Sequence, residues 1–310
     1  RGQGTHGEDP TTIGHMVASF VRGMKGNDPD NLKTAACAKH FAVNSGPEAT
    51  RHSFNAIVDE KDLRETYLPA FHTLVNAGVE AVMGAYNRIN GEPANISKTL
   101  LNILRNEWGF KGHLVTDCWA LEDIWKGHKV LSSSVEVAEA AIKAGVNMDC
   151  SNLLQDDLMK AVHQKFITEK EIDTSLSILL LTQFKLGFYD NPASSPYALY
   201  GADSVRTSYH VELARKVAAQ SMVLLKNDKN VLPIHLINTS SIYVTGCNSS
   251  SIDVLLANYH GISSDMITFV EGITKVAGPG INVQYDLGND FADSTHFSGI
   301  GNANESDVTI

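Results

Sequence analysis

The chain has 310 residues, of which 43% are hydrophobic, so it is long enough for two domains with packed cores. It contains no run of eighteen apolar residues, and no membrane-spanning helix is therefore predicted. Its formal net charge of −10 argues against nucleic acid or an anionic membrane as the main partner, because either would need a basic surface; neutral substrates are compatible with it.

Helical and strand patterns alternate through residues 1–187. The first expected helix has Asp9 as its N-cap and Pro10 in its first turn. Helices are expected over residues 7–24, 59–78, 97–109, 134–145 and from 153 to about 185. Strands are expected over residues 34–43, 79–87, 112–117 and 146–150. This alternation predicts parallel βαβ units and hence an α/β fold.

Parallel βαβ units leave two architectures open, a doubly wound open sheet and a closed eight-stranded barrel. In both, chemistry takes place at the carboxyl ends of the strands. No GxGxxG motif opens a helix, which disfavours a dinucleotide-binding sheet. Four strands are too few to close a barrel, so in a barrel the first half would lie upstream of Arg1.

Residues 188–207 are rich in Pro, Ser, Asn and Gly and lack an apolar period, so we expect a linker there. Residues 208–310 return to an α/β pattern. The elements expected there are a helix running into a strand over 208–227, strands over 241–247 and 281–288, a helix over 266–278, and a strand beginning near 306. The chain starts without methionine or a signal peptide and ends in this strand pattern, so we expect an internal fragment of a longer protein.

Polar side chains are expected at the ends of the first-region strands: Lys39, His40, Tyr86 and Asp117. A carboxylate such as Asp117 in that position can be a nucleophile, a metal ligand or a salt-bridge partner. The acids Glu122 and Asp123 follow it, but no HxH or HExxH motif occurs anywhere, which disfavours a metal site. Lys39 could form a Schiff base, as in an aldolase, or donate hydrogen bonds to substrate hydroxyls.

The four cysteines are Cys37, Cys118, Cys150 and Cys247. They are far apart in the sequence, and they form neither a CxxC pair nor a cluster with histidine of the kind that binds zinc. We therefore interpret them as free, buried thiols.

Six segments carry a resemblance to a known family. They are "RGQGTHGEDP", "KHFAVNSGPEATRHSFNA", "DLRETYLPAF", "VMGAYNRINGEPA", "NILRNEWGFKGHLVTDCWA" and "MVLLKNDKNVLP". In this order they resemble glycoside hydrolase family 3, and most of all its β-xylosidase/β-glucosidase branch. The resemblance implies that residues 1–187 are the C-terminal half of a (β/α)8 barrel, and that residues 208–310 begin an α/β/α sandwich.

The resemblance also implies roles for single residues. Asp117 falls on the catalytic nucleophile of the family. Lys39 and His40 fall on a pair that holds sugar hydroxyls in the family. Arg1 falls on an arginine that also holds a sugar hydroxyl. Tyr86 matches a tyrosine beside the nucleophile. Met83 matches a residue of the pocket wall.

Four further positions bear on the substrate site. Trp119 could be the aromatic platform beneath a sugar ring or a core side chain. Arg51 and His52 lie in the loop after "KHF" and could contact substrate or form a solvated rim. Cys118 stands where glucosidase members commonly have tryptophan, which favours the xylosidase type.

The resemblance implies a retaining mechanism, which needs a nucleophile and an acid about 5–5.5 Å apart. The acid/base of the family is a glutamate expected beyond Ile310, because Glu305 precedes the strand that should carry it. The Asp–His dyad motif of hexosaminidase members is missing from the loop after "KHF", so a hexosaminidase activity is disfavoured.

We therefore predict an exo-acting β-glycosidase that removes terminal β-linked xylose, or alternatively glucose, from oligosaccharides or aryl glycosides. No cofactor or metal is implied, and the resemblance suggests a secreted or periplasmic protein. A Schiff-base aldolase that uses Lys39 and a non-catalytic carbohydrate binder are the rival hypotheses.

Overall fold

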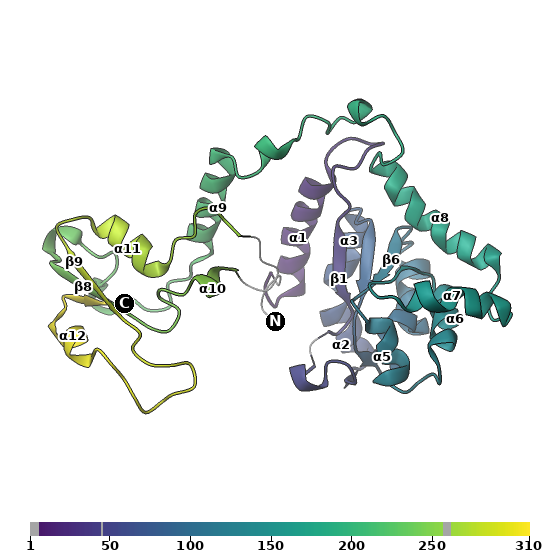
Figure 1. Ribbon diagram of the computed structural model, residues 1–310, viewed down its shortest axis with the longest axis horizontal. Coiled ribbons are helices and arrows are strands. Elements are labelled where there is room, and N and C mark those ends of the chain that lie inside the picture. The colour runs from purple at the N-terminus through teal and green to yellow at the C-terminus, as the bar shows by residue number, and fades with distance from the viewer. Residues whose placement is uncertain (1–5, 45, 257–261) are drawn as a thin grey trace. The chain divides into compact units, whose positions relative to one another are not determined.

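The computed structural model describes residues 6–44, 46–256 and 262–310 (Figure 1). By their internal contacts the residues divide into two compact units, Arg1–Thr207 and Ser208–Ile310, which are described separately. Residues 188–207, where we expected a linker, lie within the first unit.

The first unit is built on a four-stranded parallel sheet with the strand order β1-β3-β6-β7. These strands are β1 (Cys37–Phe41), β3 (Ala81–Gly84), β6 (His113–Thr116) and β7 (Val146–Met148). A small second sheet consists of β2 (Asn55–Ala56), β4 (Arg88–Ile89) and β5 (Glu92–Pro93). The predicted α/β fold with parallel strands is confirmed.

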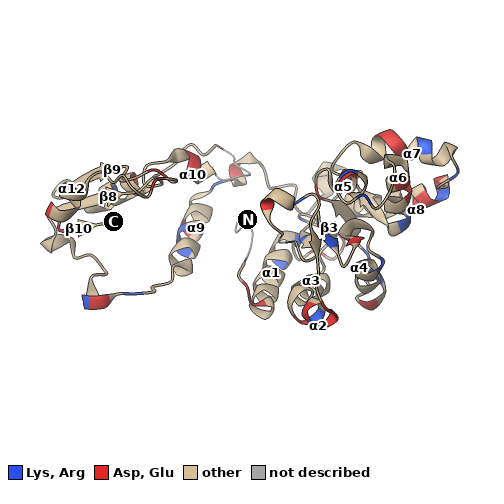
Figure 2. Cartoon of the chain, turned by 90° about the horizontal axis from the view of Figure 1, so that it is seen from below, with Lys and Arg blue, Asp and Glu red and all other residues tan. Residues whose placement is uncertain are grey.

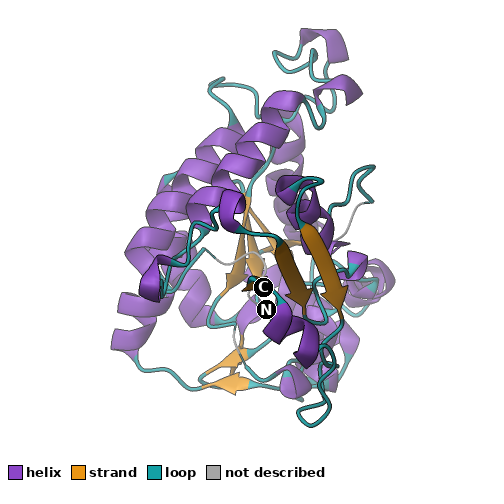
Figure 3. Ribbon diagram, turned by 90° about the vertical axis from the view of Figure 1, so that its left-hand side faces the viewer, coloured by secondary structure: helices purple, strands orange, loops and turns teal. Residues whose placement is uncertain are grey.

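Helices make up most of the regular structure of the first unit (Figure 3). They are α1 (Pro10–Lys25), α2 (Glu60–Asp62), α3 (Pro69–Asn76), α4 (Lys98–Asn102), α5 (Ala120–Lys126), α6 (Ser134–Ala144), α7 (Leu153–His163) and α8 (Glu169–Lys185). Helix α1 packs on α3, which contacts β1, whereas α6 packs on α7, and α8 contacts β6 and β7 (Figure 1).

Local signals set the ends of several helices. The Asp9 carboxylate accepts a hydrogen bond from the Thr12 N–H at 2.6 Å, and Pro10 follows it, as expected for the start of α1. The hydroxyl of Ser97 likewise caps α4. The expected helix over 59–78 is interrupted, since π-helical residues Leu63–Tyr67 separate α2 from α3, which starts at Pro69.

The core of the first unit consists of apolar side chains on and around the sheet. One cluster gathers about β1, β3 and the helices α1, α3 and α4, and a second lies between α5, α6 and α7. Acidic and basic side chains are interspersed on the helices, for example on α2 and α7 (Figure 2). No helix in the described ranges is both long and apolar enough to cross a membrane.

The second unit has a three-stranded parallel sheet with the order β10-β8-β9. Its elements are α9 (Ser208–Ser221), β8 (Ser241–Thr245), α10 (Ile252–Leu256), α11 (Phe269–Ala277), β9 (Asn282–Asp286), α12 (Ile300–Glu305) and β10 (Val308–Thr309). The strand expected at the end of 208–227 is absent from the described structure. Met222, Val223 and Leu225 are exposed, so this apolar run has neither a partner strand nor a core to stabilise it.

Candidate active site

The candidate site begins at the carboxyl end of β6, which delivers Asp117. The strand is short and lies between β3 and β7, and its last residue, Thr116, is fully buried. The Thr116 hydroxyl donates to Asp149 Oδ1 at 3.0 Å and accepts from the Cys150 N–H at 3.0 Å. These bonds join the tips of β6 and β7, so the backbone that carries Asp117 is fixed from one side.

The Asp117 carboxylate is bonded at both of its oxygens. His40 Nε2 lies 3.1 Å from Oδ2, and the Cys118 N–H donates to Oδ1 at 2.8 Å. Burial would raise the pKa of Asp117, but the hydrogen bonds from His40 and Cys118 outweigh it and hold this pKa below its usual range. The result is an oriented carboxylate that is ionised at neutral pH.

The adjacent strand β1 supplies His40 and Lys39. As expected, both residues lie near the end of their strand, since β1 ends at Phe41, and its register is irregular between Lys39 and Phe41. His40 is half-buried against Asp117, whereas Lys39 is exposed and pairs in the sheet with Met83 of β3. Lys39 and Met83 therefore lie side by side on neighbouring strands.

Tyr86 follows β3 and lies between Cys118, the residue after Asp117, and the side chains of Arg51 and His52 from the loop after β1. Its hydroxyl donates to the carbonyl of Cys118 at 2.9 Å. Burial, and then the negative charge of Asp117, raise the pKa of Tyr86 well above its ordinary value, so the side chain remains a neutral phenol. The Arg51 guanidinium lies 5.7 Å from the centre of the Tyr86 ring, and the His52 ring lies 5.2 Å from it, edge to face.

A disulfide joins Cys118, directly after Asp117, to Cys150, beyond the end of β7. The interpretation of all four cysteines as free, buried thiols is therefore wrong. Cys37 and Cys247 are free, and of these Cys37 is exposed. Pairing across neighbouring strand tips cannot be read from a separation of 32 residues, because it depends on strand order.

Trp119 lies two residues after Asp117, directly before α5. Its backbone N–H donates to the Cys150 carbonyl at 3.1 Å, and its backbone is left-handed with φ of 62°. The residue is 61% exposed, so the core alternative for Trp119 is wrong. An exposed tryptophan close to Asp117 is compatible with the other alternative, an aromatic platform.

A second acid–histidine pair lies beside Tyr86. His52 Nδ1 lies 2.8 Å from Asp123 Oδ2, and Asp123 comes from α5. Burial raises the pKa of Asp123, a trend that the hydrogen bond and charge of His52 only partly oppose. The sequence marked both residues, but they are 71 positions apart, so only the fold reveals that they form a pair.

The remaining candidates lie elsewhere. Arg1 is outside the described residues. Glu305 ends α12 in the second unit and is exposed.

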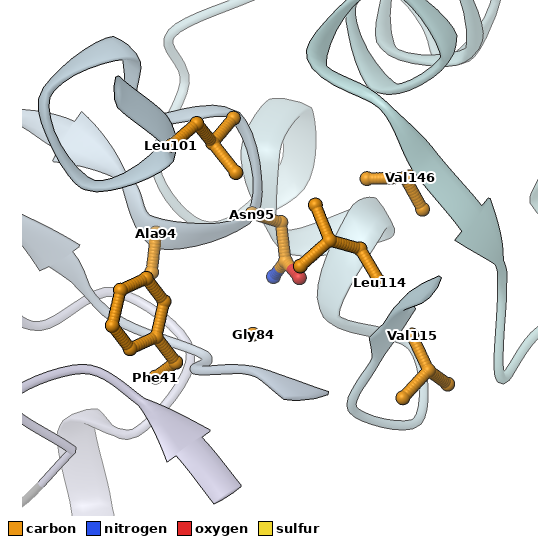
Figure 4. A pocket seen from close by; sticks show the side chains of 8 residues that line it. All are labelled: Phe41, Gly84, Ala94, Asn95, Leu101, Leu114, Val115 and Val146. Carbon is orange, nitrogen blue, oxygen red and sulfur yellow. The ribbon is translucent and has the colours of Figure 1, made fainter. Parts of the chain in front are cut away.

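A small pocket in the first unit lies apart from the candidate site. It has a volume of about 10 Å³, which suits one water molecule and is too small for a sugar ring (Figure 4). Its lining is mostly apolar core: Phe41, Gly84, Ala94, Asn95, Leu101, Leu114, Val115 and Val146.

Chemically, the site offers an ionised, half-buried carboxylate held by His40 and a backbone N–H, with a neutral phenol beside it. Such a carboxylate suits covalent catalysis at an electrophilic carbon. Among the described residues, no group of three or more His, Cys, Asp or Glu side chains could hold a metal ion.

Comparison with known protein families identifies the family of the region that carries the candidate site. Residues 1–181, which include β1, β3, β6 and β7, match the glycosyl hydrolase family 3 N-terminal domain. The chain belongs to glycoside hydrolase family 3. The predicted resemblance is thereby confirmed.

Individual family 3 members are similar over most of this chain. A xylan 1,4-β-xylosidase of Xylanibacter ruminicola is 38% identical over 278 residues, which are 88% of this chain and 32% of that protein. The structure of a GH3 exo-β-xylosidase (XlnD) with a xylobiose aziridine probe matches with a TM-score of 0.90 at 27% identity, covering 100% of this chain and 41% of that one. A β-glucosidase from Listeria innocua in complex with glucose matches with a TM-score of 0.80 at 26% identity, covering 93% and 40%.

The chain thus spans about a third of the curated relative's length and about two fifths of these solved structures. The fold of the family is shared over nearly the whole chain, while the relatives are considerably longer than 310 residues.

Proposed function

We propose that this chain is the central part of a retaining, exo-acting β-glycosidase that removes terminal β-linked xylose, with Asp117 as nucleophile. The observation that carries the proposal is the Asp117 carboxylate at the tip of β6, held by His40 at 3.1 Å and by the Cys118 N–H at 2.8 Å. The xylosidases among its relatives support the choice of sugar.

In the proposed reaction an Asp117 oxygen attacks the anomeric carbon and forms a glycosyl ester, while the bond from that carbon to the leaving oxygen breaks. An acid protonates the leaving oxygen, and its conjugate base then deprotonates the water that hydrolyses the ester. We assign this acid/base to a part of the protein beyond the 310 residues, since the relatives extend well past them. The low pKa of Asp117 keeps the nucleophile ionised.

The terminal sugar is proposed to be held by charge-assisted hydrogen bonds from Lys39 and His40, and by Arg1. Met83, which is beside Lys39 in the sheet, would form part of the pocket wall. Trp119 would contact a ring face, because the residue is 61% exposed and lies two positions after Asp117.

We also propose that Cys118 favours pentose over hexose, because a side chain smaller than tryptophan directly follows Asp117 there. A β-glucosidase with the same mechanism is the alternative, supported by the Listeria innocua structure.

We further propose that the four-stranded parallel sheet is half of a (β/α)8 barrel and that residues 208–310 begin an α/β/α sandwich. Four strands account for half of the eight that such a barrel requires. A secreted or periplasmic location is proposed with it, because disulfides such as Cys118–Cys150 persist in oxidising compartments.

The test is covalent labelling of the full-length protein that contains this chain. A 2-deoxy-2-fluoro-β-xyloside should label Asp117, as read by peptide mass. Asp117→Asn should lower kcat by several orders of magnitude, because no glycosyl ester can form. Glu122→Gln, a change at an acid paired with Lys126 on α5, is the matched control and should keep its activity. Labelling at a different residue would refute the assignment.

A further inference from the structure

The His52–Asp123 pair is not used in the mechanism proposed above. The Asp123 side chain is 11% exposed, whereas that of His52 is 58% exposed. The buried carboxylate therefore holds Nδ1 of a ring whose remainder faces outward. With Nδ1–H donating to Asp123, the neutral imidazole has its lone pair on Nε2.

The loop that carries His52 is firmly anchored. Arg88 Nη2 donates to the Ser53 carbonyl at 2.9 Å, and the backbone N–H of Arg88 donates to the Phe54 carbonyl at 2.9 Å. On the other side, Gly127 approaches so closely that a Cβ there would lie 2.0 Å from the His52 carbonyl oxygen. His52 is therefore held in place by its side chain and its backbone, unlike a residue of a freely solvated rim.

The His52 ring is separated from the nucleophile by one side chain. It contacts Tyr86 edge to face at 5.2 Å, and Tyr86 donates to the carbonyl of Cys118, the residue after Asp117. The His52 side chain is 58% exposed, whereas that of Asp117 is 18% exposed, so His52 lies nearer the surface than Asp117 does.

In an exo-acting glycosidase the terminal sugar occupies the deep end, on the nucleophile, and the leaving group points toward the mouth. The His52 ring is more exposed than Asp117 and is fixed by the buried carboxylate of Asp123. We therefore expect it to face the leaving group. The unused Nε2 can accept a hydrogen bond from a hydroxyl.

We propose that His52, positioned by Asp123, binds a hydroxyl of the leaving-group sugar. This inference rests on the proposed function. It assigns to the loop that carries His52 a preference for oligosaccharides over aryl glycosides. His52 is a binding residue in this scheme, and Asp123 is a positioning residue.

The experiment compares two substrates of the full-length protein that share the terminal xylose. Xylobiose offers hydroxyls in its leaving group, whereas p-nitrophenyl β-xyloside offers none. His52→Ala should lower kcat/KM for xylobiose about threefold to tenfold, the effect of one lost neutral hydrogen bond, and leave the aryl xyloside unchanged. Asp123→Ala should act in the same direction. Asp123→Asn, which keeps an acceptor for Nδ1–H, should retain most of the wild-type selectivity.

A second readout uses the 2-fluoroxylosyl-enzyme. Reactivation by water needs no sugar at the mouth and should be unchanged in His52→Ala, whereas reactivation by added xylobiose as acceptor should slow by the same threefold to tenfold. His163→Ala, a change at an exposed histidine at the end of α7, is the control.

The outcomes distinguish this inference from the proposed function. If Asp117 is labelled but His52→Ala matches wild type on xylobiose, only the inference is overturned. An equal loss on both substrates also overturns it, because His52 would then act in the chemistry or the fold. If no glycosyl-enzyme forms in the wild type, the proposed function fails, and the inference fails with it.

Discussion

At the scale of single residues, the hydrogen bond between His40 and Asp117 lowers the pKa of the candidate nucleophile. Burial alone would push the pKa of Asp117 up, and His40 together with the Cys118 N–H reverses this. The proposed reaction needs the ionised carboxylate, so a low pKa extends activity toward acidic pH.

Replacing His40 should therefore change the pH dependence of the enzyme. In His40→Gln the pKa of Asp117 rises, and the acidic limb of the kcat/KM profile moves to higher pH, so activity is lost earlier as the pH falls. The measurement is kcat/KM against pH for the full-length protein. His15→Gln, at an exposed position on α1, should leave the limb in place. An unshifted limb in His40→Gln would mean that another group sets it.

Lys39 is exposed on β1 and is proposed to hold a sugar hydroxyl. Loss of a charge-assisted hydrogen bond costs about 1.5–3 kcal/mol, so Lys39→Ala should lower kcat/KM by about one to two orders of magnitude. Lys33→Ala, a change at another exposed lysine, serves as the control. Full activity of Lys39→Ala would show that the lysine has no role in the pocket.

At the scale of elements, the tips of β6 and β7 form one connected structure. The Cys118–Cys150 disulfide and the hydrogen bond from the Trp119 N–H to the Cys150 carbonyl hold the loop after Asp117. The Tyr86 hydroxyl adds a bond to the Cys118 carbonyl from β3. Three strands thus determine where the candidate nucleophile lies.

Removing this disulfide should affect both stability and rate. The paired change Cys118→Ser with Cys150→Ser opens a loop of 32 residues and should lower the free energy of unfolding by about 2–4 kcal/mol. We expect kcat to fall about tenfold or more, since small displacements of a reacting group are costly. Thermal unfolding and kcat are the measurements.

Treatment of the wild-type protein with a reductant should reproduce the effect of the double change. Cys37→Ser, at a free and exposed cysteine, should show neither loss. If the double variant keeps the wild-type Tm and kcat, the disulfide does not position Asp117.

At the scale of the whole molecule, the 310 residues match proteins of about two and a half to three times their length. The four-stranded parallel sheet has β1 and β7 at its edges. In the proposed barrel further strands would cover these edges, and unpaired edges favour association with other chains.

Residues 1–310 expressed alone should therefore show essentially no hydrolysis of aryl β-xyloside. A positioned acid contributes about 10²–10⁴-fold to such a reaction, and the loss of half a barrel removes pocket walls as well. The measurement compares this chain with the full-length protein at equal concentration. Comparable turnover would contradict the prediction and would make the His52–Asp123 pair the first candidate for the acid/base.

The sequence by itself determined the α/β class, most helix positions and the family. Helix caps such as Asp9 and Ser97 are local signals, since they act within three residues, and the alternation of strands and helices can be read without any knowledge of packing. Asp117 was singled out as a candidate in a similar way, because it directly follows the strand His113–Thr116.

Only the tertiary structure decided which side chains meet. The partners His52 and Asp123 are 71 positions apart, and Cys118 and Cys150 are 32 apart, so each pairing depends on strand order and on the approach of α5 to the rim loop. The low pKa of Asp117 likewise results from contact with His40 on β1, two strands away in the sheet. Such contacts are set by packing between distant segments, and no local pattern encodes them.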